Sequence, residues 1–511
     1  MRRVQAAVRE PSAPSSAAPR TTTPWPALAA IVVLAAVLRF ATLRTQSIWF
    51  DEAATWDLVR RPFGEMLSRL PDGESNPPLF YVLEWIWTRL FGDGEAGLRS
   101  LSALAGLLTV PVAYAIGRAA AERCAAAERA GLAAAALVAV NPLLVWFSQE
   151  ARSYALATLL SALALLAFLR ALDDRRGRVL AAWALAAALA LATHYFTAFV
   201  LAPQAAWLLW RHPRRRDAVA AVGALLVAGV ALLPLLIAQS GNPYDIAGTS
   251  LALRLVQVPK QFLLGYRGPL ALPFGLLGAV LVACGAWLTM RRTPRPVRER
   301  ALLLAAIGAI GVALPLLAAL AGADYLNTRN LLPALIPLLA ALAVGCAASD
   351  VRRAGGAVLA ALCALSLAIV VTVERDAQYQ RQDWKGLSRA LGTADAPRAV
   401  VISPANGELA LRYYRRGLSP MQPRGAVVAE VDVVAVAGSP DPGRAPELPP
   451  LTGTALGVPG FGPPHETRTG TYALLRFRAP NGTPVPVPLT PLGALRFGDR
   501  FPSVDVLPAG E

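Results

Sequence analysis

Repeated apolar runs constrain this 511-residue chain more than any other feature. A membrane-spanning helix needs about 20 predominantly apolar residues, with about 17 as a lower limit. Only 16% of the residues are charged, against about 25% in a soluble domain. We therefore predict a mostly α-helical, polytopic membrane bundle of about eleven transmembrane helices. The candidate segments are residues 27–43, 101–117, 130–147, 153–172, 179–195, 196–210, 218–238, 269–290, 301–321, 331–349 and 354–373.

The basic residues predict the orientation of this bundle. Residues 1–26, rich in Arg, Ser, Ala and Pro, are interpreted as a disordered cytoplasmic N-terminus. The five inner loops then hold 17 Arg, whereas three outer loops hold five Lys or Arg in total. This is the positive-inside asymmetry of membrane proteins. We interpret the net charge of +16 as topogenic, and expect no nucleic-acid partner.

Two regions lie outside the apolar runs. The first outer loop, residues 44–100, contains an aromatic segment at 76–92 that is expected to lie in or dip into the outer interface. If this segment spanned the membrane, the Arg-rich loops would face outward. The transmembrane domain is predicted to cover residues 27–373. The polar, Pro-rich residues 374–511 predict a small extracytoplasmic α/β domain, with helices in "QDWKGLSRALG" and "ELALRYYRR" and strands in "RAVVISP", "AVVAEVDVVAVAG" and "YALLRFRA".

Ionisable and polar side chains gather in the outer loops. Such residues at the mouth of a membrane span are costly, which makes them functional candidates. The first are two adjacent carboxylates, Asp51 and Glu52, in "SIWFDEAATWDLV". A common outer location for acids and cations predicts one site there. The other candidates are Asn76, Glu150, Arg152, His194, Tyr195, Tyr244, Asp245, Lys260, Tyr266, Arg267, Asp324, Tyr325, Arg329 and Asn330.

This combination suits transfer of a group from a lipid phosphate. Activated groups reach the outer face of a bacterial membrane attached to lipids, usually through a phosphate. Transfer needs a carboxylate base for the acceptor hydroxyl, arginines for the departing phosphate and an apolar groove for the lipid. Two other hypotheses stay open at this point: a transporter or flippase of lipid-linked sugars, and a scaffold whose C-terminal region binds cell-wall polymer.

The order of the motifs resembles a known class of enzymes. The acidic pair in "FDEA" is followed by "SNPPLFYVLEWIWTRLFGDGEAGLRSLSALAGLLTVPVAY", "NPLLVWFSQEARSYAL", "THYF", "TRNLLPALIPLLAALA" and "DWKGLSRAL". The chain resembles the GT-C superfamily of membrane glycosyltransferases over residues 25–420, in the bacterial branch similar to protein O-mannosyltransferases and lipid A aminoarabinose transferases (RgtA/B/C/D-like). The resemblance implies a polyprenyl-phosphate sugar donor, an inverting transfer outside the cytoplasm, and a location in the bacterial inner membrane.

The resemblance also implies roles for individual residues. Asp51 corresponds to the general base, and Glu52 completes the catalytic acidic pair. Arg152, Arg329 and Lys260 correspond to the binding site of the donor phosphate. The residues expected to bind the acceptor or shape the site are Glu150, His194, Tyr195, Asn76, Tyr325 and Asn330.

Several of these residues also have structural interpretations. Asp51 can cap the helix that follows it. Glu150 and Arg152 can form a simple loop ion pair, and a histidine at the end of a span is often a hydrogen-bonded structural residue. Asp51, Glu52 and Glu150 permit a divalent cation, but no spacing demands one, and no cofactor is certain. The sugar stays open, and the acceptor can be a lipid, a glycan or a protein.

Overall fold

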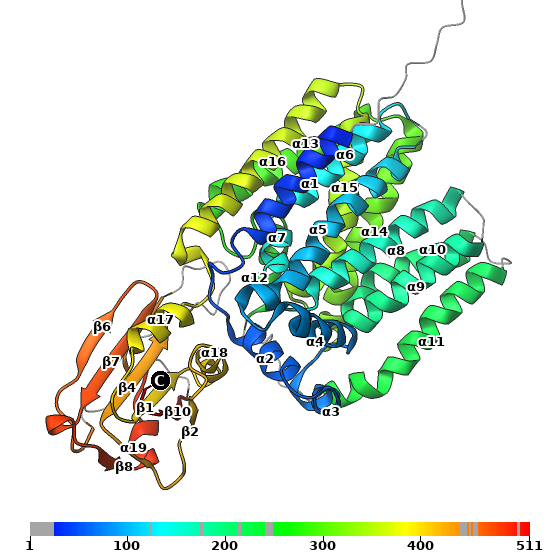
Figure 1. Cartoon of the computed structure of the whole chain (residues 1–511). Coiled ribbons are helices and arrows are strands. Elements are labelled where there is room, and N and C mark those ends of the chain that lie inside the picture. Colours follow the sequence, from blue (N-terminus) through cyan, green and yellow to red (C-terminus); the bar gives the residue numbers. More distant parts are fainter. Residues whose placement is uncertain are drawn as a thin grey trace, which may run out of the picture.

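A computed structural model shows a bundle of long helices with a smaller sheet region beneath one end of it (Figure 1). Residues 1–24 of the expected disordered N-terminus lie outside the described residues, as do Tyr244 and Asp245. The structure describes residues 25–122, 124–173, 177–211, 216–240, 249–438, 447–448, 451–452, 458–497 and 501–510.

Each of the eleven apolar segments is helical, which confirms the prediction of a mostly α-helical membrane bundle. Among the described residues, seven helices are long and apolar enough to cross a membrane, or eight if one bent pair counts as a span. The shorter ones, α1, α9 and α10, have 16, 17 and 14 residues. The bundle comprises α1 (Trp25–Phe40), α5 (Glu95–Ala120), α6 (Ala127–Val140), α7 (Pro142–Ser148), α8 (Tyr154–Asp173), α9 (Gly177–Thr193), α10 (Ala198–Arg211), α11 (Arg216–Gln239), α13 (Ala271–Arg292), α14 (Arg295–Leu320), α15 (Leu332–Ala348) and α16 (Arg352–Arg375).

The predicted segment 130–147 is not one straight helix. It bends by 59° between α6 and α7. Pro142 has no backbone N–H and cannot continue the hydrogen-bond ladder of α6. The Asn141 side chain accepts a hydrogen bond from the backbone N–H of Leu144, at 3.0 Å, and so caps α7. The short α7 then leads directly into the loop that carries Glu150 and Arg152.

Short helices cover the end of the bundle where α1 finishes. Three of them, α2 (Phe50–Val59), α3 (Phe63–Gly73) and α4 (Leu79–Phe91), form the loop between α1 and α5. With 13 residues, α4 is roughly 20 Å long, against about 30 Å for the hydrocarbon core of a bilayer. One short helix, α12 (Leu251–Leu264), occupies a region interpreted as loop from the sequence.

The sheet region follows α16. Its main sheet has the strand order β2-β10-β1-β4-β7-β6, with β1 and β4 parallel and the other neighbours antiparallel. The segment "AVVAEVDVVAVAG" is split between β3 and β4. The elements are α17 (Trp384–Leu391), β1 (Arg398–Ser403), α18 (Gly407–Tyr414), β2 (Ser419–Pro420), β3 (Ala426–Val428), β4 (Glu430–Val436), β5 (Leu451–Thr452), β6 (His465–Arg468), β7 (Tyr472–Arg478), β8 (Val485–Val487), α19 (Leu489–Gly493), β9 (Arg496–Phe497) and β10 (Ser503–Leu507).

The sheet region packs directly on α2, and Figure 1 shows α18 beside that helix. The Tyr414 hydroxyl accepts a hydrogen bond from the backbone N–H of Ile48, at 2.8 Å, and donates to Glu95, at 2.7 Å. The rings of Trp56 and Tyr413 meet edge to face, with their centroids 5.3 Å apart. The C-terminal part of the chain therefore supports the helix on which the acidic pair lies.

Candidate active site

Helix α2 presents Asp51 at the end of the bundle. Trp49 occupies the N-cap position in an extended conformation, and no side chain caps the helix. Asp51 lies in the first turn, where the helix dipole favours a carboxylate. Its Oδ2 accepts a hydrogen bond from Nη1 of Arg329, at 2.7 Å. The two side chains are 16% and 23% exposed, so this ion pair is open to a ligand.

The neighbouring Glu52 has a different environment. Its side chain is 0% exposed and accepts two hydrogen bonds of 2.6 Å from Arg99 on α5. It also accepts one from the backbone N–H of Ala151, at 3.0 Å. Burial alone would raise the pKa of Glu52, but the Arg99 guanidinium outweighs burial and holds that pKa below its usual range. Glu52 thus ties α2 to α5 and to the loop after α7.

Arg152 lies beside the Asp51 backbone. Its Nη1 donates to Glu74 at 2.7 Å, to the Thr55 hydroxyl at 3.3 Å and to the Asp51 carbonyl at 3.4 Å. The side chain is nearly buried. Arg152 and Arg329 therefore approach Asp51 from two different connections of the bundle.

Glu150 is paired with a residue from beyond the last bundle helix. Nη2 of Arg381 donates to its Oε2 at 3.1 Å and to the Trp146 carbonyl at 3.2 Å. Glu150 is 0% exposed. Burial raises the pKa of Glu150 to about 7, despite the opposing Arg381 charge. This pair links the loop after α7 to the segment that precedes the sheet region.

Arg152 and Arg329 both line a cavity of about 510 Å³. Its walls are largely aromatic and apolar, and the Tyr154 and His194 rings lie 5.5 Å apart. Burial lowers the pKa of His194 to about 3, so the ring is neutral. The lining residues are Ser75, Asn76, Arg152, Tyr154, His194, Tyr195, Phe196, Phe199, Leu236, Ile237, Gln239, Ser240, Ala318, Ala323, Tyr325, Arg329 and Asn330.

The structure brings together most of the candidates identified from the sequence. Asp51 meets the cavity through Arg329, whereas Glu52 and Glu150 are held in buried ion pairs. Lys260, on α12, is absent from the described lining. The candidates that line the cavity are Asn76, Arg152, His194, Tyr195, Tyr325, Arg329 and Asn330.

Two further outer-loop candidates hold the loops in place. Asp324 accepts hydrogen bonds from Arg254, one of them at 2.7 Å, and Arg267 donates to the Gln380 carbonyl at 2.6 Å. Within the described ranges, no group of three or more His, Cys, Asp or Glu is arranged to hold a metal ion.

Four side chains of the candidate site were not identified from the sequence. Glu74, Arg99 and Arg381 are the partners of Arg152, Glu52 and Glu150, and Tyr154 lines the cavity. Arg99 carried the clearest available signal, because it is a charge at the mouth of the second apolar run.

Residues 75–238 match the family described as "Dolichyl-phosphate-mannose-protein mannosyltransferase". The resemblance to these transferases is confirmed for this part of the chain. The matched segment contains Arg152, His194 and much of the cavity wall. No curated protein matches the chain.

Several solved structures are also similar to the chain. ArnT from Cupriavidus metallidurans bound to undecaprenyl phosphate matches with 18% identity and a TM-score of 0.45, over 67% of this chain and 63% of that one. AglB from Archaeoglobus fulgidus, in complex with an inhibitory peptide and a dolichol-phosphate, matches with 13% identity and a TM-score of 0.42, over 76% of this chain and 63% of that one. Arabinosyltransferase EmbB from Mycobacterium smegmatis matches with 15% identity and a TM-score of 0.44, over 88% of this chain and 48% of that one. The chain thus spans less than two thirds of the length of each.

Proposed function

We propose that the protein is an integral membrane glycosyltransferase. It transfers a sugar from a polyprenyl-phosphate donor to an acceptor hydroxyl, with inversion at the anomeric carbon. The site lies on the extracytoplasmic face of a bacterial inner membrane, with the N-terminus in the cytoplasm. On this proposal, residues 27–373 form the catalytic membrane domain and 374–511 an extracytoplasmic domain.

One observation carries the proposal: the Asp51 carboxylate and the Arg329 guanidinium form a partly exposed ion pair at the edge of a cavity that Arg152 also lines. A carboxylate can accept the proton of an acceptor hydroxyl. Guanidinium groups match phosphate oxygens in geometry and charge. A base and a phosphate site thus lie side by side, as the transfer requires. The phosphate-linked donor in the matched family's description supports the same donor class.

The ion pair suggests the order of events. A donor phosphate binds Arg152 and Arg329 and competes with Asp51 for the Arg329 guanidinium. Asp51, released from Arg329, takes the proton of the acceptor hydroxyl. The acceptor oxygen attacks the anomeric carbon as the bond from that carbon to the phosphate oxygen breaks. The electron pair leaves with the polyprenyl phosphate, whose charge the two arginines stabilise.

Neighbouring groups hold and complete this site. The buried Glu52–Arg99 pair fixes the first turn of α2, and with it the direction of Asp51. The Nδ1 of His194 accepts a hydrogen bond from the Phe196 N–H, so the neutral ring carries its proton on Nε2. His194 is then a hydrogen-bond donor suited to a sugar hydroxyl.

The test is the substitution Asp51→Asn, which keeps the size of the side chain and removes the base. A matched control is Asp57→Asn, six residues further along the same helix, in a partly exposed cluster with Arg60 and Arg61. We expect transfer to fall by at least about 100-fold in the first variant and to be preserved in the second. Full transfer by folded Asp51→Asn protein would disprove the role of Asp51.

A deletion strain identifies the substrates. Its polyprenyl-phosphate sugars and membrane glycans are compared with those of the complemented strain. We expect the donor to accumulate and one glycan to lose its sugar. Movement of a labelled lipid-linked sugar between leaflets by reconstituted protein, with no glycosylated product, would instead support the flippase.

A further inference from the structure

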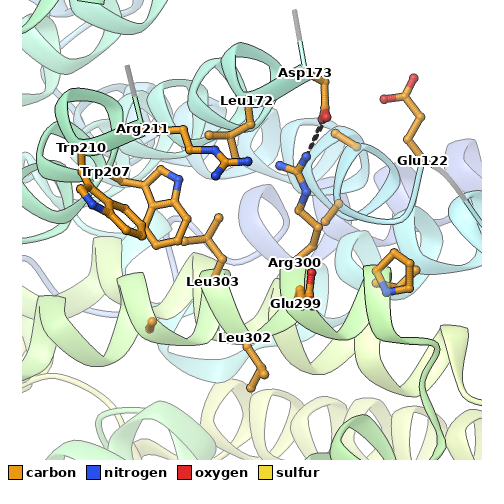
Figure 2. Close-up of a pocket in the computed structure, with 15 residues that line it drawn as sticks. Glu122, Leu172, Asp173, Trp207, Trp210, Arg211, Glu299, Arg300, Leu302 and Leu303 are labelled. Atoms are coloured by element: carbon orange, nitrogen blue, oxygen red, sulfur yellow. Dashed lines mark hydrogen bonds and ion pairs between the residues drawn. The ribbon is translucent and has the colours of Figure 1, made fainter. Parts of the chain in front are cut away.

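A second cavity, of about 630 Å³, lies at the opposite end of the same helices. Figure 2 shows the side chains that line it. It is formed where α5, α8 and α10 end and where α14 begins. The residues that line it are Ala119, Ala120, Glu122, Leu172, Asp173, Trp207, Trp210, Arg211, Pro296, Val297, Glu299, Arg300, Leu302, Leu303 and Ala306.

This cavity is separate from the Asp51 site. Helix α8 lines one cavity with its first residue, Tyr154, and the other with its last, Asp173. Twenty helical residues between these ends correspond to about 30 Å, the thickness of a bilayer core. If Asp51 faces the outside, the second cavity opens at the cytoplasmic boundary of the membrane.

Two guanidinium groups point toward one another across this cavity, from Arg211 on α10 and Arg300 on α14 (Figure 2). Arg300 donates two hydrogen bonds to Asp173, at 2.7 and 2.8 Å. Arg211 makes no ion pair or hydrogen bond within the described part of the chain, and Glu122 points away from it (Figure 2). The space between the arginines is therefore suited to an anion.

The wall beside the arginines is apolar. The Trp207 and Trp210 rings meet edge to face, 5.1 Å apart, and Trp210 is 70% exposed. Leu302 and Leu303 complete this wall. Tryptophan is enriched where a membrane protein meets the headgroup region of the bilayer. The cavity thus offers cations for a headgroup next to an apolar surface for acyl chains.

We propose that this cavity binds the headgroup of an anionic phospholipid. Arg211 and Arg300 bind its phosphodiester, and the acyl chains lie along Trp207, Trp210 and Leu303. Basic pockets between membrane helices bind such headgroups in this way. An anionic lipid is favoured over a zwitterionic one because Asp173 and Glu299 are already paired, with Arg300 and Arg295. The proposal rests on the membrane location of the chain and not on glycosyl transfer.

The test measures lipids retained by the purified full-length protein in native mass spectrometry. The probes are dioleoyl phosphatidylglycerol and its phosphatidylcholine and phosphatidylethanolamine counterparts. We expect the protein to retain phosphatidylglycerol in preference to the other two lipids. Arg211→Gln should weaken the binding of phosphatidylglycerol about fivefold, as expected for one arginine at the headgroup level. The matched control, Arg291→Gln, changes an exposed arginine at the end of α13 that is absent from the described lining.

A second variant tests the same site in the opposite direction. Asp173→Asn releases Arg300 from its carboxylate partner, so binding of phosphatidylglycerol should become tighter. Equal retention of the three lipids, or equal losses in Arg211→Gln and Arg291→Gln, would overturn the proposal. So would a greater loss of undecaprenyl phosphate than of phosphatidylglycerol in Arg211→Gln, which would identify a different occupant of this cavity.

Discussion

Two ion pairs beside the Asp51 site are much more deeply buried than the Arg300–Asp173 pair at the other end of the bundle. At the Asp51 end, the pairs Glu52–Arg99 and Glu150–Arg381 are almost completely buried. At the other end, the Arg300 and Asp173 side chains are 23% and 33% exposed. Buried ion pairs are costly to form and costly to break, so they hold a structure in one geometry. Exposed pairs exchange partners readily, which suits a surface that binds lipid.

Breaking the Glu52–Arg99 pair should have the largest effect. Glu52→Gln leaves the buried Arg99 charge uncompensated, at a cost of about 3–5 kcal/mol in the free energy of unfolding. Thermal unfolding of the protein in detergent measures this loss. The control is Glu65→Gln, an exposed carboxylate on α3, which should change the melting temperature little. Equal shifts in the two variants would show that burial does not distinguish these carboxylates.

The pH dependence of stability should come next in size. Glu150 has a folded pKa of about 7 against an ordinary value of 4.5, so between these values the folded state binds more protons than the unfolded state. Its stabilising contribution is complete below pH 4.5 and is lost as the pH rises to about 7. The loss is about 3 kcal/mol. We expect melting temperatures to fall over this window, and Glu150→Gln to remove that component. An unchanged slope in the variant would contradict the assignment.

A smaller effect is expected where the sheet region meets the bundle. Tyr414→Phe removes the hydrogen bond to Glu95 and leaves the Ile48 N–H without its acceptor. The expected loss is about 1–2 kcal/mol, with faster proteolysis between α16 and α17. Tyr472→Phe serves as the control, because the Tyr472 hydroxyl makes no hydrogen bond among the described residues. Comparable losses in both would indicate that the contact with α2 contributes nothing specific.

The smallest effect on stability should come from the Arg300–Asp173 pair, at the end of the bundle opposite Asp51. A double-mutant cycle with Arg300→Gln and Asp173→Asn should give a coupling of at most about 1 kcal/mol, because the pair is partly exposed. The measurement is again thermal unfolding in detergent. A coupling as large as that between Glu52 and Arg99 would remove the contrast between the two ends.

Much of the bundle could be predicted because long runs of apolar residues identify membrane helices in a sequence. The bend at Asn141–Pro142 was missed, since the apolar run continues through it and only the proline marks the break. Helix α12 was missed for the opposite reason. Its buried face carries Arg254, Gln257 and Gln261, so it has no long apolar run.

The sequence predicted that the site residues lie on the same face of the membrane, but not which of them are in contact. Loop charges placed Asp51, Arg152 and Arg329 on one face of the membrane, and the structure brings them together. The partners of the buried carboxylates could not be found in this way. Glu52 and Arg99 are 47 positions apart in the sequence, and Glu150 and Arg381 are 231 apart. Such pairs depend on the three-dimensional packing of helices, which local patterns do not encode.

The long separations between Asp51 and Arg329 and between Glu150 and Arg381 have a consequence for biosynthesis. Arg329 follows Asp51 by 278 positions, and Arg381 follows the last bundle helix. A chain still attached to the ribosome therefore inserts most of its helices before either arginine is made. Until then, Asp51 and Glu150 lack these two partners, whereas Arg99, the partner of Glu52, is already present. Translation order thus makes Glu52–Arg99 the first of these ion pairs that can form, before the pairs of Asp51 and Glu150.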